Sequence, residues 1–201
     1  MLLLISSLLL MSCGADKYMK KGEKFLALGE YYDAADQFKQ AYTRTPAKER
    51  DTRGKRALKM AQCYQRINAT PKAIAAYRNA IRYNLAAKED QLAYARQLLK
   101  NGDYRQAEKV FLMLKDSMPG NQLVANGLKS AQMAPEWKKQ GSRYIVKRMD
   151  VFNSRRHDYS PVLFGDDYDQ LYFTSTRNEA LGDELSGITG TKAGDIFLSE
   201  K

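Results

Sequence analysis

The side chains best able to do chemistry are few and widely separated. The 201-residue sequence has two cysteines, Cys13 and Cys63, and one histidine, His157. No motif pairs a nucleophile with a general base, and a single histidine without paired cysteines is too little for a metal site. We therefore expect a chain that is not an enzyme and that holds no metal and no cofactor. We interpret His157, next to Arg155 and Arg156, as a loop residue, and Cys63 as a small core residue of a helix.

Lysine and arginine are abundant in the sequence, and they are unevenly distributed along it. The sequence has 33 Lys and Arg against 23 Asp and Glu, a net charge of +10. Residues 1–140 hold 25 cations and 13 carboxylates, whereas residues 141–201 hold 8 and 10. With 44% hydrophobic and 28% charged residues, the chain can bury a core and is not broadly disordered. The change in charge predicts two structural regions that join near Gly141.

The first twelve residues, MLLLISSLLLMS, are apolar but shorter than the roughly 20 residues that a spanning helix needs. Residues 1–12 therefore suit the apolar region of a signal peptide. The sequence that follows, Leu10-Met11-Ser12-Cys13-Gly14, resembles a bacterial lipobox. This resemblance implies cleavage before Cys13 and lipid attachment at Cys13, within residues 13–14. Because the residue after Cys13 is Gly14, the resemblance also implies that the chain lies at the periplasmic face of the outer membrane. The alternative is an ordinary buried cysteine after a signal core.

A 34-residue pattern recurs three times, in segments that start at Ala15, Gly54 and Lys88. Each segment has small residues where two helices would approach, an aromatic ring between them, and Gly or Asn at the turn. The small residues are Gly22, Ala61 and Ala95 in the first helices and Ala34, Ala73 and Ala107 in the second helices. The turn residues are Gly29, Asn68 and Gly102, and the aromatic residues are Phe38, Tyr77 and Phe111. The pattern resembles the tetratricopeptide repeat (TPR). It implies a mainly α fold, an α-solenoid of three repeats plus a capping helix at Gln122–Gln132, within a domain of residues 15–140.

The first helices of such repeats line a concave groove, which we expect to be cationic. Its inner-face positions are Lys20, Lys55, Lys59, Gln62, Arg66, Arg96 and Lys100. These residues predict a site for an acidic or C-terminal segment of a partner protein, although a solvated charged helix face explains them equally well. The carboxylate clamp of chaperone-binding TPR proteins is not reproduced, because its positions hold Met19, Glu23, Lys59, Glu89 and Ala93. We expect no nucleic-acid binding, because most tyrosines and phenylalanines occupy core positions of the repeats.

Residues 141–201 change to a β pattern. We predict strands at Arg143–Asp150, at Leu171–Thr174 and after Asp195, with a turn beginning at Ser160-Pro161. The segment from Asp158 to Glu200 resembles a WD40-like propeller repeat of the TolB type, known as PD40.

That resemblance implies one incomplete β-propeller blade, in which Arg177 and Asp195 form a structural pair. A closed propeller takes about 4–8 blades. We therefore expect either that the chain is a piece of a longer protein or that a partner covers the open sheet edge.

The order of lipobox, TPR array and propeller region resembles the N-terminal part of the OmpA-family lipoproteins of Bacteroidota. The order is similar to that of the PorE-type subunits of the type IX secretion system. The resemblance implies a non-enzymatic scaffold, held at the outer membrane by its lipid, that docks periplasmic or outer-membrane proteins. Peptidoglycan binding would require a C-terminal OmpA-like domain. The alternative is the N-terminal fragment of a TolB-type propeller peptidase or hydrolase.

Overall fold

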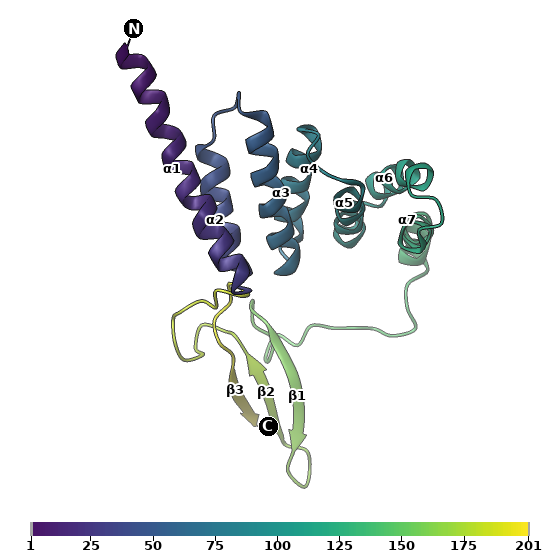
Figure 1. The fold of residues 1–201 in the computed structure, drawn as a ribbon. Coiled ribbons are helices and arrows are strands. Elements are labelled where there is room, and N and C mark those ends of the chain that lie inside the picture. Colours follow the sequence, from purple (N-terminus) through teal and green to yellow (C-terminus); the bar gives the residue numbers. More distant parts are fainter. Residues whose placement is uncertain (1, 201) are drawn as a thin grey trace. The chain divides into compact units, whose positions relative to one another are not determined.

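The computed structural model describes the backbone of residues 2–200 and the side chains of residues 14–200. The chain forms two compact units, Met1–Gly141 and Ser142–Lys201. The first unit is helical and the second contains a small sheet (Figure 1). The helices are α1 Leu2–Ala27, α2 Tyr31–Arg44, α3 Arg50–Arg66, α4 Thr70–Arg82, α5 Lys88–Asn101, α6 Tyr104–Ser117 and α7 Gln122–Gln140. This order confirms the predicted mainly α array followed by a β-region.

The helices of the first unit pack in sequence, each against the next. A left-handed residue follows the first helix of every pair: Gly29 at φ +77°, Asn68 at +58° and Gly102 at +85°. These are the three predicted turn positions, and glycine or asparagine takes this conformation at the lowest cost. Proline stops two of the three second helices, since α2 ends two residues before Pro46 and α6 two residues before Pro119, whereas α4 ends at Arg82, before the left-handed Asn84. The local signals of the repeat therefore set the helix ends.

Small residues let the helices approach one another. Ala34, Ala73 and Ala107 are completely buried. A Cβ atom added to Gly22 of α1 would lie 2.7 Å from the Phe38 ring of α2, so only glycine fits there. The aromatic rings that fill the spaces, Phe38, Tyr77 and Phe111, are all buried. Close packing of small residues against rings makes one continuous core from repeat to repeat.

The last helix is longer than expected. We predict its end at Gln132, but α7 continues to Gln140 with Pro135 inside it. Pro135 is exposed, so water can satisfy the carbonyl that its missing N–H leaves free. At the other end, the side chain of Asn121 accepts hydrogen bonds from the N–H groups of Leu123 and Val124, at 3.0 and 3.2 Å. This N-cap fixes the start of the helix.

The second unit holds three antiparallel strands in the order β1-β2-β3. Their bounds are β1 Asp158–Phe164, β2 Gln170–Ser175 and β3 Asp195–Glu200. The strand predicted at Arg143–Asp150 is wrong: these residues form no ladder, and Val146 is 92% exposed. A short run of residues with high strand propensity makes a strand only where a partner strand is available.

The predicted turn at Ser160-Pro161 is also wrong. Both residues lie inside β1, where the register shifts between Tyr159 and Val162. Ser160 has a φ of +53°, and Pro161 has no N–H to donate. A bulge on an edge strand accommodates both features.

Within the part of the chain that the structure describes, no helix is long and apolar enough to cross a membrane.

Candidate functional site

A cavity of about 390 Å³ opens among the first four helices. Its lining, which we call the groove pocket, consists of Leu26 of α1, Tyr31 of α2, Gln62, Gln65 and Arg66 of α3, and Tyr77 of α4. The guanidinium of Arg66 lies 5.7 Å from the centre of the Tyr31 ring. The Tyr77 hydroxyl donates a hydrogen bond of 2.6 Å to the Gln65 side chain, and burial raises the pKa of that hydroxyl. The pocket thus combines one cation, two amides and two phenol rings.

The structure gathers only part of the predicted groove in this pocket. Gln62 and Arg66 line it, while the other five predicted residues do not. Two predicted residues also form hydrogen bonds between neighbouring repeats: the Gln62 amide, which lines the pocket, donates to Asp90 at 3.2 Å, and Lys100 donates to Asn68 at 2.7 Å. The remaining side chains are Lys20, Lys55 and Arg96, which are exposed, and Lys59, which is half-buried.

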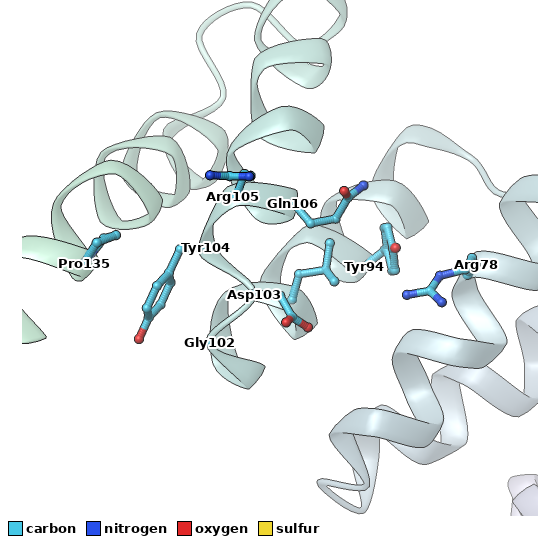
Figure 2. A pocket seen from close by; sticks show the side chains of 9 residues that line it. Arg78, Tyr94, Gly102, Asp103, Tyr104, Arg105, Gln106 and Pro135 are labelled. Atoms are coloured by element: carbon cyan, nitrogen blue, oxygen red, sulfur yellow. The ribbon is translucent and has the colours of Figure 1, made fainter.

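A larger cavity of about 680 Å³ lies at the turn between α5 and α6 (Figure 2). Its lining, the turn pocket, is Arg78, Tyr94, Leu98, Gly102, Asp103, Tyr104, Arg105, Gln106 and Pro135. Arg78 comes from α4 and Pro135 from α7, so four consecutive helices contribute to it. Sequence reasoning missed this pocket, because its residues meet only after neighbouring repeats have stacked.

A buried arginine ties the first three helices together, and sequence reasoning missed it too. Arg56 of α3 is 5% exposed. It donates to the Ala41 carbonyl at 3.2 Å, to the Thr45 hydroxyl, and to the carboxylate of Asp16 in α1. A buried guanidinium needs such partners. The packed array therefore already includes Asp16, three residues after Cys13.

The predicted pair between Arg177 and Asp195 is wrong. Asp195 accepts a hydrogen bond from the N–H of Leu181, and Arg177 pairs with Asp158 at 3.0 Å instead. The sequence pattern placed Arg177 correctly at the end of β2 but could not identify its partner, which lies at the start of β1.

Asp158 is the centre of a saturated hydrogen-bond network. It also accepts from the Ser175 hydroxyl at 2.6 Å and from the Ser154 N–H at 2.6 Å. Burial raises the pKa of the Asp158 carboxyl, but the hydrogen bonds from Ser175, Ser154 and Arg177 together hold it well below its usual range. The Arg177 guanidinium lies 4.8 Å from the ring centres of both Phe173 and Phe197. This cluster ties the three strands together, and we assign it a structural role.

Solved structures resemble the helical unit. The first TPR domain of Spaghetti (RPAP3), solved with the HSP90 peptide SRMEEVD, is 18% identical with a TM-score of 0.50, covering 63% of this chain and 96% of that one. The C-terminal TPR-containing domain of an FK506-binding protein of Plasmodium falciparum is 15% identical with a TM-score of 0.53, covering 65% and 94%. The helical unit is a TPR array. No family model and no curated protein matches the sequence.

The structure describes the side chain of Cys63 but not that of Cys13. Cys63 of α3 is 1% exposed and lies in the core, as predicted. Burial raises the pKa of its thiol to about 11, against a small lowering by the charge of Lys59. The side chain of Cys13 lies outside the described residues, so its lipid attachment stays a prediction.

We expect Cys63 to resist thiol reagents in the folded array. In a Cys13→Ser chain, where Cys63 is the only thiol, the raised pKa leaves about 100-fold less thiolate at pH 8 than an ordinary cysteine has. Reaction with 5,5′-dithiobis(2-nitrobenzoate) should be at least that much slower in buffer than in guanidinium chloride. Equal rates in the two solutions would show that Cys63 is accessible.

Proposed function

We propose that this chain is a non-enzymatic docking scaffold whose TPR array captures acidic segments of partner proteins. The groove pocket carries the proposal. Arg66 is exposed beside it, Gln62 and Gln65 offer amides, and Tyr31 offers an aromatic wall. A carboxylate side chain of a partner segment can pair with the Arg66 guanidinium, while the backbone of the same segment forms hydrogen bonds with the Gln62 and Gln65 amides.

The cationic character of the groove supports an acidic partner. Lys55, Lys59, Arg66, Arg96 and Lys100 follow one another along α3 and α5, and no ion pair neutralises them among the described residues. The similar domain of Spaghetti was solved with an acidic peptide of HSP90. Our chain lacks the residues of the chaperone clamp, so we propose a different acidic segment as its ligand.

The location and assembly are further parts of the proposal. A lipid on Cys13 would hold the array at the periplasmic face of the outer membrane, where it would dock periplasmic or outer-membrane proteins of a secretion or envelope assembly. The three-stranded sheet would be part of a propeller blade. The lipobox-like sequence and the PD40-like segment support these assignments.

A peptide-binding measurement tests the groove. We would titrate the chain into a fluorescein-labelled peptide of twelve Asp and Glu residues, with the matching Asn and Gln peptide as reference. Fluorescence anisotropy should show binding of the acidic peptide only. The double variant Arg66→Glu with Arg96→Glu should weaken it by about tenfold or more, since each substitution replaces attraction with repulsion.

The matched control changes the same charge on another surface. Lys109→Glu with Lys115→Glu places two carboxylates on exposed positions of α6. This variant should bind the acidic peptide within about threefold of the unmodified chain. An equal loss in both variants would assign binding to overall charge, and an acidic peptide that binds no better than its amide counterpart would overturn the proposal.

A further inference from the structure

One end of the TPR array carries arginines stacked on tyrosines. Arg44 lies 4.4 Å from the ring centre of Tyr18, Arg53 lies 4.4 Å from Tyr42, and Arg50 and Arg82 lie 5.4 and 5.1 Å from Tyr83. We call these seven residues the arginine–tyrosine edge. They come from α1, α2, α3, α4 and the residue that follows α4.

Hydrogen bonds hold this edge in place. Arg53 donates to the Tyr83 hydroxyl at 3.2 Å and to the Thr45 carbonyl at 2.5 Å, so one side chain joins α2, α3 and α4. The hydrogen bond from Arg53 also lowers the pKa of the Tyr83 hydroxyl. The edge is therefore a fixed surface, and its cations do not have to be ordered when a ligand binds.

The edge lies at the end of the array from which the apolar N-terminal residues extend. Figure 1 shows α1 projecting beyond the turn between α2 and α3, on the side where that turn lies. The packed array includes residues close to Cys13, because Ala15 is 1% exposed and Asp16 is paired with Arg56. A lipid on Cys13 would thus be joined to the packed array without a linker, and the edge would face the same surface.

We propose that the arginine–tyrosine edge lies on a bilayer of acidic phospholipids. This inference rests on the membrane location given under the proposed function, and not on the groove. Residues 44–53 and 82–83 hold five cations, Arg44, Lys48, Arg50, Arg53 and Arg82, against two carboxylates, Glu49 and Asp51.

The chemistry of the edge matches that surface. Arginine binds phosphate oxygens through paired N–H groups, and tyrosine is enriched at the membrane–water interface. A guanidinium stacked on a phenol ring still presents its N–H groups outward, so a lipid phosphate can bind without breaking the stack. Each Lys or Arg near an anionic membrane strengthens binding by about fivefold.

The test is a lipid titration of the full chain, made without lipidation. We would measure partition coefficients on vesicles of phosphatidylethanolamine with phosphatidylglycerol, and on vesicles of phosphatidylcholine. The edge variant replaces four exposed cations by glutamine: Arg44→Gln, Lys48→Gln, Arg50→Gln and Arg82→Gln. The control variant removes the same charge elsewhere, at exposed Lys109, Lys115, Lys129 and Lys138.

The edge variant lacks four cations, so at about fivefold each it should lose about 600-fold in partitioning to acidic vesicles and nothing to neutral ones. The control variant should lose less than about threefold on either. Hydrogen exchange of the unmodified chain on acidic vesicles should slow in residues 44–53 and leave α6 unchanged.

An equal loss in both variants would assign binding to the net charge of the chain and overturn the inference. So would an edge variant that partitions like the unmodified chain. The neutral vesicles report separately on the apolar N-terminal residues, and acidic-peptide binding reports on the groove. Failure of either one is therefore distinguishable from failure at the edge.

Discussion

Replacing Asp158 by asparagine should unfold the sheet unit and leave the TPR array intact. Asparagine cannot supply the charge that Arg177 pairs with, nor accept all the hydrogen bonds that come from Ser154, Ser175 and Arg177. Removing one partner of a fully buried ion pair costs about 3–5 kcal/mol, and the loss here is smaller because 19% of the Arg177 side chain is exposed. The unit has three strands, about the smallest sheet that is stable by itself, and most residues of β1 are exposed, so even this smaller loss should unfold it.

Hydrogen exchange with mass spectrometry measures this directly. Amides of β2 should lose their protection in Asp158→Asn, while those of α3 should keep theirs and serve as an internal reference. The control is Asp183→Asn, which removes another carboxylate of the same unit. Asp183 pairs with Lys192 at 3.3 Å but is fully exposed, so its loss should change little. Protected β2 amides in Asp158→Asn would contradict the structural role of this carboxylate.

The same carboxylate predicts how the sheet unit responds to acid. The folded-state pKa of Asp158 is lowered, so its stabilising contribution is fully present above the unfolded value of about 3.9. It is lost as the pH falls below about 4 towards the lower folded-state pKa. Exchange protection of β2 should therefore be constant from pH 7 to 5, after correction for intrinsic rates, and should fall below pH 4. Asp183→Asn, which removes only an exposed carboxylate, should keep this acid step.

The repeat was predictable because each of its signals acts within a few residues. Gly29, Asn68 and Gly102 take left-handed angles for reasons that belong to their own backbone. Small residues in the first and second helix of each repeat show which helix faces will meet. Phe38 and Phe111 show which rings fill the space between those helices. The helices therefore begin, end and pack as the local pattern predicts.

The sheet unit and the pockets were predicted less well because they depend on long-range pairing. Residues 143–150 contain the strand-forming run Tyr144-Ile145-Val146, but no neighbouring strand pairs with them. Arg177 pairs with Asp158 and not with Asp195, the partner that the propeller resemblance favoured, although both carboxylates are similarly far away in the sequence. The lining of the turn pocket extends from Arg78 to Pro135, a separation that no local pattern encodes. The candidate groove stays a prediction: only Gln62 and Arg66 of its seven predicted residues line the groove pocket, which Tyr31 of α2 and Tyr77 of α4 also line.

Truncating Phe111 to alanine should open the C-terminal end of the TPR array. Phe111 of α6 is completely buried, and its ring packs against Gly127 of α7, where a Cβ atom would not fit. Phenylalanine to alanine in a core costs about 3–5 kcal/mol. Stability in a repeat array is a sum of local terms, so the loss should fall on the helices next to the cavity. The last pair has a neighbour on one side only, and α7 contributes just three buried residues, Val124, Gly127 and Ala131.

Hydrogen exchange at increasing urea concentration measures this change, because Trp137 of α7 is 51% exposed and its emission would respond little. In Phe111→Ala the amides of α7 should lose protection at a lower urea concentration than those of the other helices, because α6 and α7 unfold first. Phe38→Ala is the matched control, since Phe38 is as buried but belongs to the first repeat. In that variant α7 should not lose its protection before the other helices. A Phe111→Ala array in which all helices lose protection together would mean that the cap is coupled to the repeats more strongly than its small buried face implies.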